Sequence, residues 1–159
     1  GRPMDELAQQ SAGGKYELPR AHVSGAELDM SFSGLKTAVV NLAHNAQQNG
    51  EPLDEPALAR DFTQAVSDEL TERAALALEQ TGRTVLVAAG GVAANSIIRA
   101  DLQRLCEKRG VKLYLPPLKW CGDNGAMIGA QGYYEYMAGV RGNMTLNGYA
   151  TMELDAVRF

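Results

Sequence analysis

The stretch at residues 84–95, T-V-L-V-A-A-G-G-V-A-A-N, constrains what this chain can fold into more than any other part of the sequence. Its first six residues are apolar or β-branched, which predicts a short buried strand. Gly90 and Gly91 follow, and without a Cβ they let the backbone turn sharply and come close to a bound group. Asn95 and Ser96 are both favoured at a helix N-cap, so a helix is predicted to begin here.

A strand, a glycine turn and a helix N-terminus in this order present backbone N–H groups to a phosphate. The pattern is therefore typical of a nucleotide site. It also occurs in an ordinary turn between a strand and a helix, where two adjacent glycines are common. Both interpretations stay open at this point.

A second strand is predicted at residues 111–115, after a helix at 96–108. Strand, helix and strand over about thirty residues make a βαβ unit, whose strands are parallel and joined by a right-handed crossover. Apolar spacing of three and four predicts further helices, and a short apolar run predicts one more strand. The helices are expected at 3–8, 33–50, 56–80 and 124–138, the strand at 28–32, and a loop at 13–25. The fold class is α/β, with a short parallel sheet flanked by long helices.

Composition narrows the class of protein. The 159 residues are 45% hydrophobic and 21% charged, which suits one globular domain or a piece of a larger one. A net charge of -4 argues against a protein that mainly coats nucleic acid. Two widely spaced cysteines give neither a disulfide framework nor a zinc pattern. No membrane span or signal peptide is visible, so we expect a cytoplasmic protein with no membrane partner.

Two turns are expected at the carboxyl ends of the parallel strands, where α/β proteins bind ligands. One is the turn at 90–95, and the other is C-G-D-N at 121–124. Within the second turn, Asp123 is the candidate metal ligand, because a carboxylate coordinates hard cations. The alternative is a plain N-cap aspartate. His22 and His44 are isolated in the sequence and predict no zinc site.

Three motifs together resemble a known family. They are S-F-S-G-L-K-T-A at 31–38, A-G-G-V-A-A-N-S at 89–96 and C-G-D-N-G-A-M-I-G at 121–129. In this order and spacing they look like the carboxyl-terminal half of the TsaD family, the tRNA N6-adenosine threonylcarbamoyltransferases once described as O-sialoglycoprotein endopeptidases. The resemblance covers nearly all of the chain, and the lysine in the first motif is similar to the bacterial or organellar branch.

The resemblance implies an actin-like fold of two lobes around a nucleotide cleft, related to sugar kinases and Hsp70. Residues 1–159 would be the second lobe, and the first lobe is absent from the chain. The family transfers a threonylcarbamoyl group from threonylcarbamoyl-AMP to N6 of adenosine 37 in tRNAs that read A-starting codons. The resemblance also implies one divalent metal ion, iron or zinc, a bound threonylcarbamoyl-AMP or ATP, and the partners TsaB and TsaE.

Carried over position by position, the resemblance implies that Asn95 binds the nucleotide and Asp123 binds the metal. Gly90 and Gly91 belong to the same nucleotide motif. Gly1 and Asp5 match the end of the family's P-G-G-x-x-x-D element, where a glycine and an aspartate meet the nucleoside. The family's usual threonine before the metal aspartate is Gly122 here, which removes a hydroxyl near the site.

The family's H-x-x-x-H metal motif is absent from this chain. We therefore interpret the chain as a fragment of the enzyme that is inactive and self-associates when isolated. One alternative is a non-catalytic actin-like lobe that binds partners. Another is a metalloendopeptidase, which would need a motif such as H-E-x-x-H that the sequence lacks.

Overall fold

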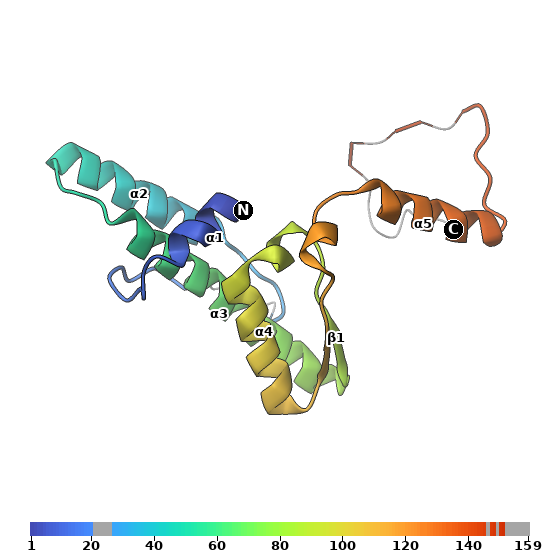
Figure 1. The fold of residues 1–159 in the computed structure, drawn as a ribbon, viewed down its shortest axis with the longest axis horizontal. Coiled ribbons are helices and arrows are strands. Elements are labelled where there is room, and N and C mark those ends of the chain that lie inside the picture. The colour runs from blue at the N-terminus through green and yellow to red at the C-terminus, as the bar shows by residue number, and fades with distance from the viewer. Residues whose placement is uncertain (21–26, 146, 149, 152–159) are drawn as a thin grey trace. The chain divides into compact units, whose positions relative to one another are not determined.

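The structure, a computed structural model, describes residues 1–20, 27–145, 147–148 and 150–151. It divides into two compact units, Gly1–Gly122 and Asp123–Phe159. Of the elements formed by the described residues, all except α5 lie in the first unit (Figure 1). In chain order they are α1 (Arg2–Ala8), α2 (Ser33–Asn49), α3 (Glu55–Thr81), β1 (Val85–Val87), the 3-10 helix η1 (Gly91–Ala94), α4 (Ser96–Arg109), β2 (Lys112–Tyr114), the 3-10 helix η2 (Leu118–Trp120) and α5 (Gly125–Met137).

The predicted long helices are confirmed, and local chemistry explains where they begin and end. The Asp54 side chain caps α3 by accepting from the backbone N–H of Ala57 at 3.1 Å. Three glycines, Gly50, Gly82 and Gly110, end α2, α3 and α4 in the left-handed conformation, at φ of 66°, 63° and 64°. A residue without a Cβ adopts that conformation at little cost, so each glycine stops its helix.

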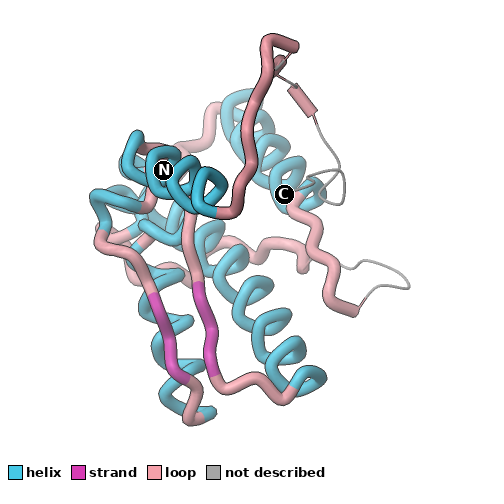
Figure 2. Tube along the Cα trace, turned by 90° about the vertical axis from the view of Figure 1, so that its right-hand side faces the viewer, coloured by secondary structure: helices cyan, strands magenta, loops and turns pink. Residues whose placement is uncertain are grey.

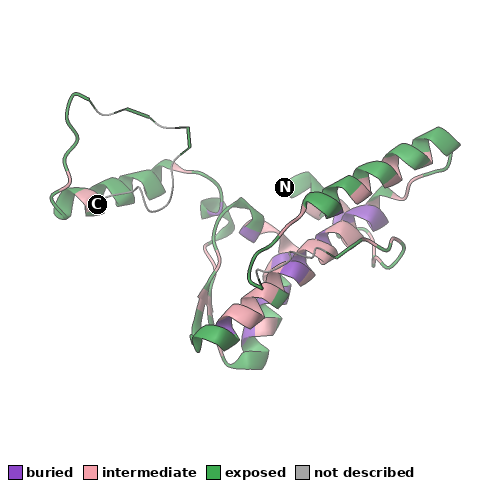
Figure 3. Ribbon diagram, turned by 180° about the vertical axis from the view of Figure 1, so that it is seen from behind, coloured by how far each residue is buried: buried purple, intermediate pink, exposed green. Residues whose placement is uncertain are grey.

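The apolar core of the first unit lies where three helices meet. Ala8 of α1, Ala59 of α3 and Ile97 of α4 form one buried cluster, with Leu7 packed against it. Ala8 is 0% exposed. Figure 1 shows α1 lying against the first half of α3, and Figure 3 shows buried residues along α3 and α4. This core fixes α1 against the beginning of α4.

Farther along, the contact between α3 and α4 is polar. The Ser67 hydroxyl, 0% exposed, donates to Asp101 Oδ2 at 2.5 Å, and Gln64 Nε2 donates to the same oxygen at 2.9 Å. Arg104 donates to the other oxygen of Asp101. A buried carboxylate is tolerated when hydrogen bonds replace its lost hydration, and these donors do so.

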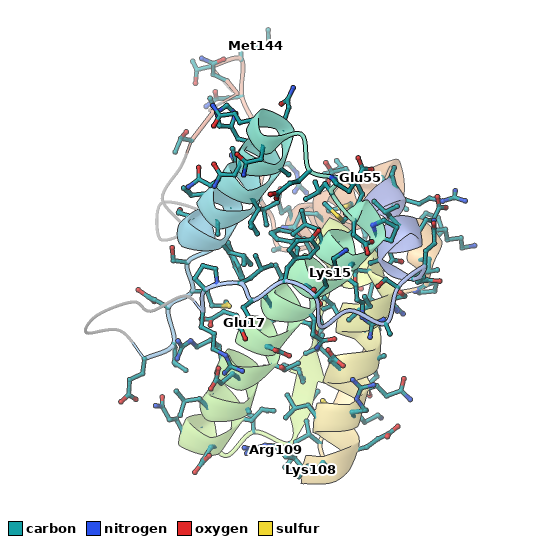
Figure 4. The ribbon with its side chains drawn as sticks, turned by 90° about the vertical axis from the view of Figure 1, so that its left-hand side faces the viewer. Lys15, Glu17, Glu55, Lys108, Arg109 and Met144 are labelled. Carbon is teal, nitrogen blue, oxygen red and sulfur yellow. The ribbon has the colours of Figure 1, made fainter. Side chains whose placement is uncertain are left out.

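The 13–16 segment is held on the beginning of α3. The Asp61 carboxylate accepts from the backbone N–H groups of Gly14, Lys15 and Tyr16 at 2.6, 3.0 and 2.8 Å. Lys15 Nζ also reaches Asp54 Oδ2 at 3.0 Å, and Figure 4 shows Lys15 beside α3. The predicted loop is described up to residue 20. This part has no helix or strand but is anchored on α3, and residues 21–26 lie outside the described residues.

The two predicted sheet strands pair in parallel, as expected for a βαβ unit (Figure 2). Leu86 is opposite Leu113, and each strand is three residues long, shorter than predicted. The prediction that the first strand is buried is wrong, because Val85 and Val87 are 46% and 67% exposed. Residues two apart in a strand share a face, so these valines mark one side of the sheet as exposed.

The strand predicted at 28–32 is also wrong. The structure has a turn at Glu27 and Leu28, and no regular structure from there to residue 32. The turn is held by side chains of α3 instead of a neighbouring strand. Arg73 Nη1 donates to the Glu27 carbonyl at 2.9 Å, and Gln80 Nε2 donates to the Glu27 carboxylate at 2.9 Å.

The second unit contains α5, which confirms the helix predicted at 124–138. Asn124 is its N-cap and accepts from the backbone N–H of Met127 at 3.0 Å. No residue of α5 is buried, and Ile128 is 70% exposed. None of the helices over the described residues is both long and apolar enough to span a membrane.

The elements of the two units, taken together, confirm the predicted α/β class, with a small parallel sheet and mostly helices.

Candidate functional site

Two of the predicted site residues, Asp5 and Asn95, meet at the N-terminus of α4. Asn95 is the N-cap, and its Oδ1 accepts from the backbone N–H groups of Ile97 and Ile98 at 3.0 and 3.1 Å. Asp5 lies 91 positions away from Ser96, yet its Oδ1 accepts from the Ser96 backbone N–H at 3.1 Å and from the Ser96 hydroxyl at 2.7 Å. The first N–H groups of a helix lack intrahelical acceptors, so both side chains satisfy groups that would otherwise be unpaired.

The packing of α1 places Asp5. Ala8, about one turn farther along α1, lies in the core against α3 and α4. The same face of α1 therefore carries Asp5 to the start of α4. The Asp5 charge is favourable there, because a helix N-terminus has a partial positive charge. Gly1 is the N-cap of α1, and its carbonyl accepts from the Asp5 backbone N–H at 3.1 Å.

The predicted glycine turn is present, but its two glycines differ. Gly90 has φ of 92° and ψ of 172°, a conformation that L residues with a side chain rarely adopt. Gly91 begins η1 and does not have a positive φ. A Cβ added at either glycine would meet nothing within 4 Å. The backbone conformation thus requires glycine at position 90 and not at position 91, and both positions leave open space above the backbone.

Arg99 was missed by the sequence analysis, although it joins the turns after the two strands. Its Nη1 donates to the Ala93 carbonyl at 2.8 Å, and its Nη2 donates to the Pro116 carbonyl at 3.1 Å. Nη1 also lies 3.7 Å from the sulfur of the buried Cys121. A sequence signal existed, because helix side chains lean toward the N-terminus, and a long one in the first turn of α4 reaches the preceding loops.

Asp123 is the first residue of the second unit. The interpretation of Asp123 as an N-cap is wrong, since Asn124 caps α5. Asp123 is exposed. No group of three or more His, Cys, Asp or Glu residues able to hold a metal occurs within the described part of the chain. His44 is exposed on α2, and His22 lies outside the described residues.

A cavity of about 180 Å³ lies elsewhere in the first unit, between the 16–20 segment and α3. Its lining includes Tyr16, Leu35, Asp61 and Asp68, and none of the predicted site residues. The predicted nucleotide residues therefore do not line this cavity. Asp5 and Asn95 lie instead at the start of α4.

Comparison with known proteins identifies the family. A family model described as "tRNA N6-adenosine threonylcarbamoyltransferase" and named TsaD matches residues 1–130. Curated relatives of that name come from Staphylococcus saprophyticus, 41% identical over 155 residues, and Ligilactobacillus salivarius, 44% identical over 156 residues; each alignment covers 98% of this chain and 45% of the relative. A third, from Limosilactobacillus reuteri, is 43% identical over 162 residues, with 99% of this chain and 46% of the relative covered.

The chain thus spans about half the length of the curated relatives it matches, at 45% to 46%. It aligns with their carboxyl-terminal half. The match extends from Gly1 through the glycine turn, Asn95 and Asp123. The chain belongs to the TsaD family of tRNA N6-adenosine threonylcarbamoyltransferases.

Proposed function

We propose that the protein containing these residues transfers a threonylcarbamoyl group from threonylcarbamoyl-AMP to N6 of adenosine 37 in tRNAs that read A-starting codons. In this proposal residues 1–159 are the second lobe of an actin-like enzyme of the cytoplasm that works with TsaB and TsaE. The observation that carries it is the meeting of Asp5 and Asn95 at the start of α4 in a chain of this family.

The proposed nucleotide site uses the Asn95 side-chain nitrogen, which the helix cap does not engage. Asn95 Oδ1 accepts the two capping hydrogen bonds, and Nδ2 has no partner in the described part of the chain. That amide group can donate two hydrogen bonds to a ribose or phosphate. Asp5 can accept from a nucleoside hydroxyl. The bare backbone at Gly90, Gly91 and Gly1 would allow threonylcarbamoyl-AMP or ATP to approach closely.

In the same proposal Asp123 supplies one ligand to a metal ion, iron or zinc. The described residues do not form a complete metal site, because no further group of ligands lies among them. One carboxylate holds a transition metal weakly, so the other ligands would come from the half of the family that this chain does not cover. When bound, such a metal would act as a Lewis acid. We assign no reaction step to it.

The proposal can be tested with the full-length protein, its TsaB and TsaE homologues, threonylcarbamoyl-AMP and unmodified tRNA. Mass spectrometry of digested nucleosides should detect N6-threonylcarbamoyladenosine at position 37. Asp123→Ala should lower both metal content and product, whereas Asp29→Ala, which removes another exposed carboxylate, should change neither.

Two outcomes would contradict parts of the proposal. Full metal content in the Asp123→Ala protein would show that this carboxylate is no ligand. Absence of product from the metal-loaded wild type, with partners present, would favour the non-catalytic lobe instead.

A further inference from the structure

We propose that Ser96 is a positioning residue, which holds the Asp5 carboxylate in place for the nucleotide, and that Gln9 orients Ser96 for this task. The inference rests on the proposed function, since it assumes that Asp5 faces the nucleoside. It adds two residues, Ser96 and Gln9, that the sequence analysis did not assign to the site. The observation behind it is a continuous row of hydrogen bonds from α1 to α4 and back.

The direction of each hydrogen bond in this row follows from chemistry. An ionised carboxylate only accepts, so the Ser96 hydroxyl must use its single proton on Asp5 Oδ1, at 2.7 Å. Ser96 Oγ can then only accept from Gln9, whose Nε2 lies at 2.9 Å. The row therefore reads Gln9 to Ser96 to Asp5, with one consistent arrangement of protons.

In this row one oxygen of Asp5 keeps most of its capacity to accept hydrogen bonds. Oδ1 accepts from both the hydroxyl and the backbone N–H of Ser96, at 2.7 and 3.1 Å. Oδ2 has only a long contact of 3.3 Å with the same N–H. Two donors on Oδ1 fix the rotation of the carboxylate, and Oδ2 keeps the capacity to accept from a hydroxyl group. A phosphate would be repelled here by like charge, so the expected ligand group is a ribose hydroxyl.

The position of Ser96 also explains why a hydroxyl is needed. Ser96 is the first residue of α4, directly after the N-cap Asn95. Its backbone N–H alone would hold Asp5 through a single donor. The hydroxyl adds the shorter of the two bonds to Oδ1 and connects Asp5 to the far end of α1, where Gln9 lies. Loss of the hydroxyl should leave the helices intact and loosen only the carboxylate.

The test compares ATP with 2′,3′-dideoxy-ATP, which lacks both ribose hydroxyls, by calorimetry on the full-length protein. Wild type should prefer ATP, and Asp5→Ala should abolish the preference. Ser96→Ala should weaken ATP binding about 5- to 20-fold and leave dideoxy-ATP binding unchanged, whereas Ser96→Thr should restore ATP binding to within about twofold. Gln9→Ala should give a smaller loss of the same kind. Gln10→Ala is the matched control, because Gln10 donates to the Glu6 carbonyl and not to Ser96.

The outcomes separate this inference from the proposed function. Thermal unfolding followed by circular dichroism should show that Ser96→Ala remains folded. If wild type has no preference for ATP, the role of Asp5 in the proposed site and this inference are both wrong. If Asp5→Ala loses the preference but Ser96→Ala keeps it, or loses affinity for both nucleotides equally, only the positioning role of Ser96 is wrong.

Discussion

Replacing Asn95 separates the two roles that one side chain combines in this structure. Its Oδ1 caps α4 through two hydrogen bonds, to the N–H groups of Ile97 and Ile98. Both isoleucines are buried, so these N–H groups have little access to water. Asn95→Ala removes the cap, and we expect it to lower the free energy of unfolding by about 1 to 2 kcal/mol. Asn95→Ser keeps a capping oxygen and should cost less than about 0.5 kcal/mol.

The two variants should nevertheless lose nucleotide affinity to the same extent. Both lack the Asn95 amide, and the shorter serine side chain does not extend to where Nδ2 lies. Stranding a polar group of the ligand costs about 1 to 3 kcal/mol, which corresponds to a loss of about 5- to 150-fold in affinity. If the Asn95 amide binds the nucleotide, both variants should therefore lose affinity, although only Asn95→Ala loses much stability.

The measurement combines urea unfolding followed by circular dichroism with calorimetric titration of ATP into the full-length protein. We expect the Asn95→Ser protein to be about as stable as wild type. Its affinity for ATP should be as low as that of the Asn95→Ala protein. The reasoning is refuted if serine at position 95 binds ATP as wild type does while alanine loses both properties together. In that case Asn95 would be only a helix cap, and the nucleotide would lie elsewhere.

Three further predictions concern the fold. In a double-mutant cycle, Ser67→Ala and Asp101→Ala should be coupled by about 1 to 2 kcal/mol in urea unfolding, because their hydrogen bond of 2.5 Å is buried; additive losses would contradict this. The hydrogen bond from Lys15 lowers the pKa of Asp54 below its ordinary 3.8. The stabilisation from the ionised Asp54 carboxylate is therefore present above pH 3.8 and is lost as the pH falls through the lowered pKa. Unfolding midpoints measured down to about pH 3 should fall less with acid in Lys15→Ala than in wild type. Residues 1–159 alone should form a dimer or larger assembly through the exposed side of the sheet around Val87, and light scattering that shows a monomer at tens of micromolar would contradict this.

Local chemistry in the sequence was sufficient to predict the helices and the parallel βαβ unit. Gly50, Gly82 and Gly110 stop their helices because the left-handed conformation is unfavourable for residues with a Cβ. Asn95 caps α4 as predicted, because its short polar side chain reaches the first free N–H groups of the helix. These features depend on neighbours within a few positions, so the sequence contains the information directly.

Contacts between distant segments decided the rest. The strand predicted at 28–32 does not form, because side chains of α3 hold Glu27 and no strand formed by the described residues pairs with this segment. Whether Val87 is buried depends on which element covers the sheet, a property that its own pattern does not contain. An apolar run predicts a preference for burial, whereas burial itself requires a partner surface.

The candidate site shows the same division. The resemblance to the TsaD family singled out Asp5 and Asn95, but the packing of Ala8 against α3 and α4 is what brings Asp5 to Ser96. The position of Arg99 in the first turn of α4 was the only sequence signal for its link between two loops, because its acceptors are backbone carbonyls, which every residue carries. The sequence by itself determined the helices, their ends and the family. Only the tertiary structure decided which side chains share the start of α4, because a hydrogen bond depends on distances that spacing along the chain does not set.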